Sequence, residues 1–188
     1  MQHPSLLLVR PILLVITLRC TERLRSLLKV PDSLGAATSP ALLGDWYANL
    51  LTTRPRHLAI CVNERSLLVL ILPLAPHSSF LTRFRESAVA RISQVLAPAE
   101  ALRLETDALE HVQIGKTQSR SVLGSLNELR YLGKVHLTRQ PVPDPESLAL
   151  FLCHTPMFAL TTSWSWMEAT MILGGDVDEA RRRLIAAT

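Results

Sequence analysis

The densest cluster of cations, hydroxyls and amides in this 188-residue chain lies at 115–127 and reads Gly-Lys-Thr-Gln-Ser-Arg-Ser-Val-Leu-Gly-Ser-Leu-Asn. Such a cluster suits anion binding if a helix begins within it, because the first N–H groups of a helix are unpaired and its dipole attracts negative charge. The residues that we expect to contact a ligand here are Lys116, Thr117, Ser119, Arg120, Ser121 and Asn127. The predicted chemistry is therefore recognition of a phosphate or another anion.

The triplet Gly-Lys-Thr also ends the phosphate-binding loop of nucleotide hydrolases. That loop requires a further glycine at the position occupied here by Glu110. The sequence therefore does not contain this loop, and no cofactor can be named from it.

A purely structural interpretation of the cluster is open as well. Thr117 or Ser119 would then only cap the helix, which is worth about 1 kcal/mol. Lys116 and Arg120 would pair with acids elsewhere in the chain and fix the helix to the sheet.

Four residues outside the cluster complete the candidate ligand-binding set. They are Asp45, Tyr47, Asn49 and Glu64, which fall on or beside predicted strands that could lie next to the helix. Asp45 and Glu64, with His111, are also the acids and bases that a hydrolase of phosphate esters would use. Whether the protein is an enzyme is left open, and no catalytic residue is assigned.

The elements that must position these residues indicate an α+β fold. Alternating or continuous apolar runs predict five strands, near 12–20, 45–52, 57–63, 66–73 and 110–115. Residues 58–62 and 67–72 are continuously apolar, which is typical of central strands buried on both faces. Helical periodicity begins again at Val122. We expect a mainly antiparallel sheet packed by helices, with a helical C-terminal segment.

The predicted organisation is an N-terminal extension at 1–11, a core domain at 12–139 and a helical segment at 140–188 that packs on the core. Arg10-Pro11 interrupts the first apolar run, which is too short for a membrane span. A signal peptide or anchor, and a first strand that reaches back to Leu6, are the alternatives. We expect no membrane association.

Composition favours a folded protein of modest charge. Hydrophobic residues make up 48% and charged residues 19% of the chain, and the net charge is +4. Arginine is spread along the sequence rather than gathered, so a nucleic-acid partner is only weakly indicated. Three widely spaced cysteines favour a reducing cytoplasm, and the six scattered histidines give no metal-ligand spacing.

Three motifs in this order resemble an uncharacterised bacterial family of unknown function. They are Gly-Asp-Trp-Tyr-Ala-Asn-Leu at 44–50, Val-Asn-Glu-Arg-Ser-Leu-Leu at 62–68 and Gly-Lys-Thr-x-Ser-Arg-Ser-Val-Leu-Gly-Ser-x-Asn at 115–127. The resemblance covers residues 12–135. It implies a first strand near 12–20 and brings no activity with it.

The function that we expect is a binding module for an anionic or phosphate-bearing ligand at the 115–127 junction. A phosphate-ester hydrolase is one alternative. A non-catalytic protein-interaction or regulatory partner is the other, with the apolar stretch Phe151 to Leu173 as its surface.

Overall fold

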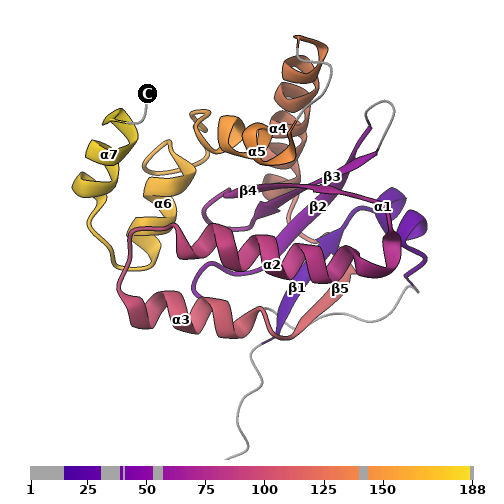
Figure 1. Ribbon diagram of the computed structural model, residues 1–188, viewed down its shortest axis with the longest axis horizontal. Helices are drawn as coiled ribbons and strands as arrows, with labels where there is room; N and C mark the ends of the chain where they lie inside the picture. Colours follow the sequence, from indigo (N-terminus) through magenta and orange to yellow (C-terminus); the bar gives the residue numbers. More distant parts are fainter. Residues whose placement is uncertain (1–14, 31–38, 40, 53–56, 140–143, 187–188) are drawn as a thin grey trace, which may run out of the picture.

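The computed structural model describes residues 15–30, 39, 41–52, 57–139 and 144–186, with the side chains of 139 and 184–186 left out. Figure 1 shows one twisted sheet with helices packed around it. The expected extension, 1–11, lies outside the described residues. Within the described residues, five strands and seven α-helices form, as an α+β fold requires.

The sheet is mixed, which corrects the prediction of a mainly antiparallel one. Its strands are β1 (Ile16–Cys20), β2 (Trp46–Leu51), β3 (Leu58–Asn63), β4 (Val69–Pro73) and β5 (Val112–Lys116). They lie in the order β4-β3-β2-β1-β5. β1 runs parallel to both β2 and β5, whereas β2 with β3 and β3 with β4 are antiparallel.

The parallel pairs occur where helices separate the paired strands along the chain. Helix α1 (Glu22–Leu28) joins β1 to β2, and helices α2 (Phe80–Ser93) and α3 (Ala99–Ala108) precede β5. A helical crossover carries the chain back to the end of the sheet at which it started, so the next strand runs parallel. Short connections reverse the chain between β2, β3 and β4, which are therefore antiparallel.

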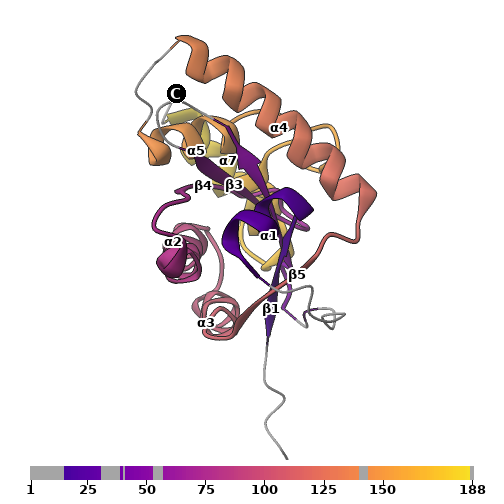
Figure 2. The same ribbon diagram turned by 90° about the vertical axis from the view of Figure 1, so that its right-hand side faces the viewer.

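Helices cover both faces of the sheet. Figure 2 shows α2 and α3 on one side of the sheet and α4 (Arg120–Arg139) on the other. The side chains of β2 alternate between the two layers: Trp46 packs edge-on against Phe84 of α2, with ring centroids 5.7 Å apart, and Tyr47 reaches the start of α4. This alternation is what a strand with helices on both faces requires.

The remaining helices are α5 (Pro145–Cys153), α6 (Ser165–Ile172) and α7 (Val177–Ala186). Asp144 caps α5, because its Oδ2 accepts the N–H of Ser147 at 2.9 Å, and Pro145 fills the first helical position. Helix α5 packs against β4 and α4, and α7 packs against α6.

The two continuous apolar strands are buried, but only β3 is central. β4 lies at the edge of the sheet, and α5 covers it. Cys153 at the end of α5 is fully buried, and its Sγ accepts the N–H of Val69 at 3.2 Å. An apolar run thus predicts that a strand is buried, but it does not predict that the strand is central. Here a helix, instead of another strand, protects the edge of the sheet.

Candidate functional site

A buried ion pair joins the ends of β1 and β2. Arg19 and Asp45 have side chains only 2% and 1% exposed, and Arg19 Nη2 lies 2.7 Å from Asp45 Oδ2. The other carboxylate oxygen accepts the backbone N–H of Thr17 at 2.9 Å. Burial raises the pKa of Asp45, while the hydrogen bond from Thr17 and the charge of Arg19 lower it in part. Both oxygens of the Asp45 carboxylate therefore have partners within the protein, and its role is structural.

Arg19 also ties this pair to the end of β5. Its Nη1 donates to the backbone oxygen of Lys116 at 3.3 Å. Arg19 was not among the residues predicted for the site, although a single arginine at the end of an apolar run was a usable signal. A buried arginine needs a carboxylate, and Asp45 directly precedes another buried strand.

Glu64 fixes the start of β2 to the turn after β3. Its Oε2 accepts the backbone N–H of Asp45 at 3.0 Å, and its own N–H donates to the oxygen of Asp45 at 2.8 Å. The first and second sequence motifs therefore meet through two hydrogen bonds.

Tyr47 and Asn49 connect β2 to the 115–127 stretch. The hydroxyl of Tyr47 accepts the N–H of Ser119 at 3.1 Å, and Asn49 Nδ2 donates to Asn127 Oδ1 at 3.3 Å. On its other side, Asn49 Oδ1 accepts the hydroxyl of Thr21 at 3.1 Å. Hydrogen bonds thus connect all three motifs along β2, from Asp45 before its first residue to Asn49 beside the carboxyl end of β1.

Helix α4 begins at Arg120, and Ser119 is its cap. Ser119 Oγ accepts the N–H of Val122 at 3.3 Å, in agreement with one of the two predicted capping residues. Within the described part of the chain, the N–H groups of Arg120 and Ser121 have no acceptor. Both residues are exposed. The helix therefore presents two unpaired donors to solvent beside a guanidinium.

Lys116 and Thr117 lie next to this helix start. Lys116 is the last residue of β5 and is exposed, and Thr117 is half-buried. Asn127 is exposed two turns further along α4. Lys116, Arg120 and Ser121 are therefore exposed to solvent, whereas Tyr47 and Asp45 are buried in the core.

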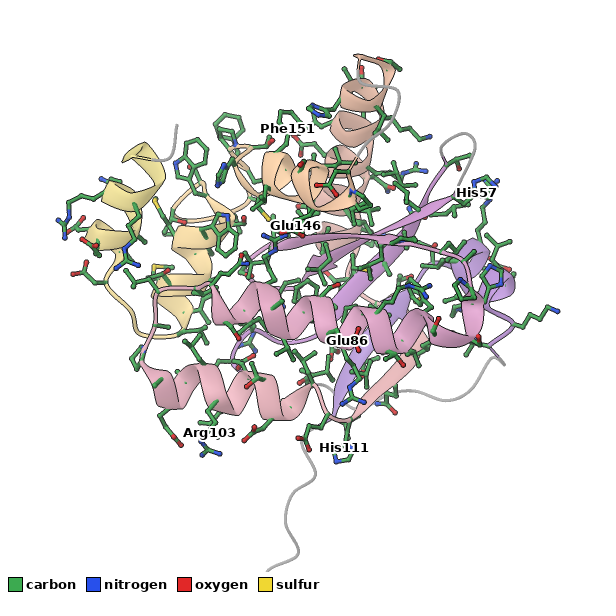
Figure 3. The ribbon with its side chains drawn as sticks, viewed as in Figure 1. His57, Glu86, Arg103, His111, Glu146 and Phe151 are labelled. Carbon is green, nitrogen blue, oxygen red and sulfur yellow. The ribbon has the colours of Figure 1, made fainter. Side chains whose placement is uncertain are left out.

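The residues suggested for acid–base chemistry do not gather around these cations. Asp45 is sealed in its ion pair with Arg19. His111 precedes β5 whereas Lys116 ends it, a separation of about 15 Å along an extended strand. Figure 3 shows His111 at the end of the sheet where β5 begins. Among the residues described, no cluster of three or more His, Cys, Asp or Glu side chains could hold a metal ion.

Together these features define an α+β protein with a mixed five-stranded sheet and a hydrogen-bonded polar end. The family model described as Domain of unknown function (DUF6933) matches residues 17–166, and the chain belongs to this family. The match confirms the resemblance and extends through α5. No curated protein and no solved structure matches the chain. No helix in the described ranges has the length and apolar character needed to cross a membrane.

Proposed function

We propose that this protein binds an anionic, phosphate-bearing ligand at the carboxyl ends of β1 and β5. These neighbouring parallel strands continue into helices on different sides of the sheet. α1 packs against β2 and the short 3₁₀ turn that precedes α2, and α4 packs against β2 and β3 on the face of the sheet opposite α2 (Figure 2). In open α/β sheets, ligands bind where adjacent strands diverge in this way.

The observation that carries the proposal is the open start of α4. Two backbone donors without acceptors among the described residues stand at the positive end of a 20-residue helix. The Arg120 side chain emerges at the same place, and among the described residues it makes no ion pair. A phosphate group would satisfy both N–H donors and the guanidinium at once.

The candidate residues divide into two roles in this proposal. Lys116, Thr117, Arg120 and Ser121 contact the ligand, with Asn127 at the far side. The remaining candidates, which are Asp45, Tyr47, Asn49 and Glu64, hold the strand ends and the helix start in place through the hydrogen bonds described above. Binding is favoured over hydrolysis, because Asp45 is held in its ion pair, Glu64 accepts the N–H of Asp45, and His111 lies at the opposite end of β5 from Lys116.

Titration with inorganic pyrophosphate, followed by backbone amide NMR, tests this function. We expect saturable shifts of the Arg120 and Ser121 amides. Arg120→Ala should weaken binding at least fivefold, because it removes the guanidinium while leaving the helix in place. Binding should weaken with added salt, since exposed charges are screened.

The matched control is Lys134→Ala, which removes an exposed cation from the same helix about 21 Å away along its axis. Its affinity for pyrophosphate should equal that of the unmodified protein. An equal loss of affinity in both variants would show that net charge, and not the position of Arg120, determines binding. The absence of saturable shifts with pyrophosphate would refute the proposal.

A further inference from the structure

A second candidate site lies where the last three helices meet the end of α2. A cavity of about 220 Å³ opens there, and Figure 1 shows α6 and α7 beyond the ends of α2 and α5. Its wall includes Gln94, Leu96, His154, Trp166, Thr170 and Arg183. None of the lining residues belongs to α4, so the cavity is separate from the site proposed above.

The surroundings of this cavity are rich in donors and poor in acceptors. Among the described residues, no aspartate or glutamate lines it. Behind the wall lies Arg91, only 2% exposed, with its guanidinium 5.3 Å from the centre of the Trp166 ring. The Nε of Arg91 and the indole Nε1 of Trp166 are buried without an acceptor among the described residues. Buried donors of this kind call for a partner that accepts hydrogen bonds.

The charge of Arg91 is only partly compensated. Its Nη2 donates to Glu146 at 2.7 Å, but the Glu146 side chain is 59% exposed. Its Nη1 makes a long contact of 3.4 Å with Gln94, which lines the cavity. A buried guanidinium with a solvated partner leaves positive potential on the cavity side.

Arg183 supplies a second cation at the mouth. Glu179 holds its Nε at 2.9 Å, and among the described residues its two Nη groups have no acceptor. Burial and the charge of Arg91 lower the pKa of His154, so this imidazole adds little positive charge near neutral pH, and the arginines supply the positive charge around the cavity. The free face of Arg183 can therefore receive a carboxylate, which is the group that a planar guanidinium binds best.

The apolar part of the wall sets the size of the ligand. Trp166 and Leu96 provide a flat surface and an aliphatic one. A dry cavity of about 150 Å³ is enough for benzene, so the larger volume here admits one ring and an acidic substituent. We propose that this cavity binds a small monocyclic aromatic acid, with its carboxylate on Arg183 and its ring against Trp166.

Benzoate is the probe that tests this inference in the full-length protein. Binding is followed through the indole N–H resonance of Trp166, which is assigned by its loss in Trp166→Phe. We expect a saturable shift with benzoate and at least tenfold weaker binding of benzamide, which has the same shape without the charge. Arg183→Ala or Arg183→Gln should weaken benzoate binding at least tenfold.

Arg182 provides a closely matched control. Arg182 and Arg183 both pair with Glu179, and both side chains are 66% exposed, but only Arg183 lines the cavity. Arg182→Ala should therefore change benzoate affinity less than twofold. The proposal is overturned if benzoate gives no saturable shift, if benzamide binds equally well, or if Arg182→Ala weakens binding as much as Arg183→Ala.

Discussion

At the scale of single residues, the buried ion pair between Arg19 and Asp45 stabilises the contact between β1, the start of β2 and the end of β5. Removing Asp45 leaves a buried guanidinium without its carboxylate and the N–H of Thr17 without an acceptor. We expect Asp45→Ala to lower the free energy of unfolding by about 3–5 kcal/mol. Chemical denaturation, read by far-ultraviolet circular dichroism, measures this loss.

Asp107 offers the comparison for this variant. It pairs with Arg103 at 2.8 Å, but those two side chains are 50% and 58% exposed. Solvent screens such a pair, so Asp107→Ala should cost no more than about 1 kcal/mol. If Asp45→Ala costs no more than Asp107→Ala, the pair does not stabilise the fold, and Asp45 would again be available for a role in ligand binding.

At the scale of elements, the start of α4 depends on one serine hydroxyl. Ser119 Oγ accepts the N–H of Val122, so Ser119→Ala should lower the free energy of unfolding by about 1 kcal/mol. Ser121 is exposed and does not cap the helix, so Ser121→Ala should change the free energy of unfolding by less than about 0.5 kcal/mol. Equal losses in the two variants would show that the cap does not stabilise the helix.

The positions of the elements were largely predictable from the sequence, because each follows from local physics. Apolar runs placed the five strands, and the return of helical periodicity at Val122 predicted α4. The direction of pairing was predicted wrongly. The antiparallel strands β3 and β4 are buried and continuously apolar, a pattern that is more usual in parallel sheets, so the pattern did not reveal the direction. The helices between β1 and β2, and before β5, carried that information through the crossover rule.

The start of a helix within 115–127 was predictable, whereas the contacts of the candidate residues were not. The cluster at 115–127 indicated a helix start with hydroxyls and cations, and Ser119 is its cap. A carboxylate partner for Arg19 could be expected, but neither the choice of Asp45 nor the bond between Ser119 and Tyr47 could be predicted, because these partners are far apart in sequence. Long-range pairing depends on strand order, which the pattern of one chain does not encode.

At the scale of the whole molecule, a single glycine lets the C-terminal helices pack on the core. A Cβ added at Gly175 would lie 1.9 Å from the backbone oxygen of Leu96, after α2, and 2.9 Å from a methyl carbon of Thr170. The backbone of Leu96 cannot rotate away as the end of a flexible side chain can. The turn between α6 and α7 would therefore have to move away from Leu96. We expect Gly175→Ala to lower the free energy of unfolding by about 1–3 kcal/mol.

Gly124 allows the same chemical change without the same contact. It lies inside α4, and an added Cβ would meet nothing within 4 Å. Gly124→Ala should raise the free energy of unfolding by about 0.5–1 kcal/mol, because alanine is more stable than glycine inside a helix.

Thermal unfolding compares the two variants. The melting temperature of Gly175→Ala should lie below that of the unmodified protein and that of Gly124→Ala above it. The two should differ by at least about 3 °C, since 1 kcal/mol corresponds to about 2–4 °C in a chain of this size. An unchanged melting temperature for Gly175→Ala would mean that the close approach of Gly175 to Leu96 does not contribute to stability.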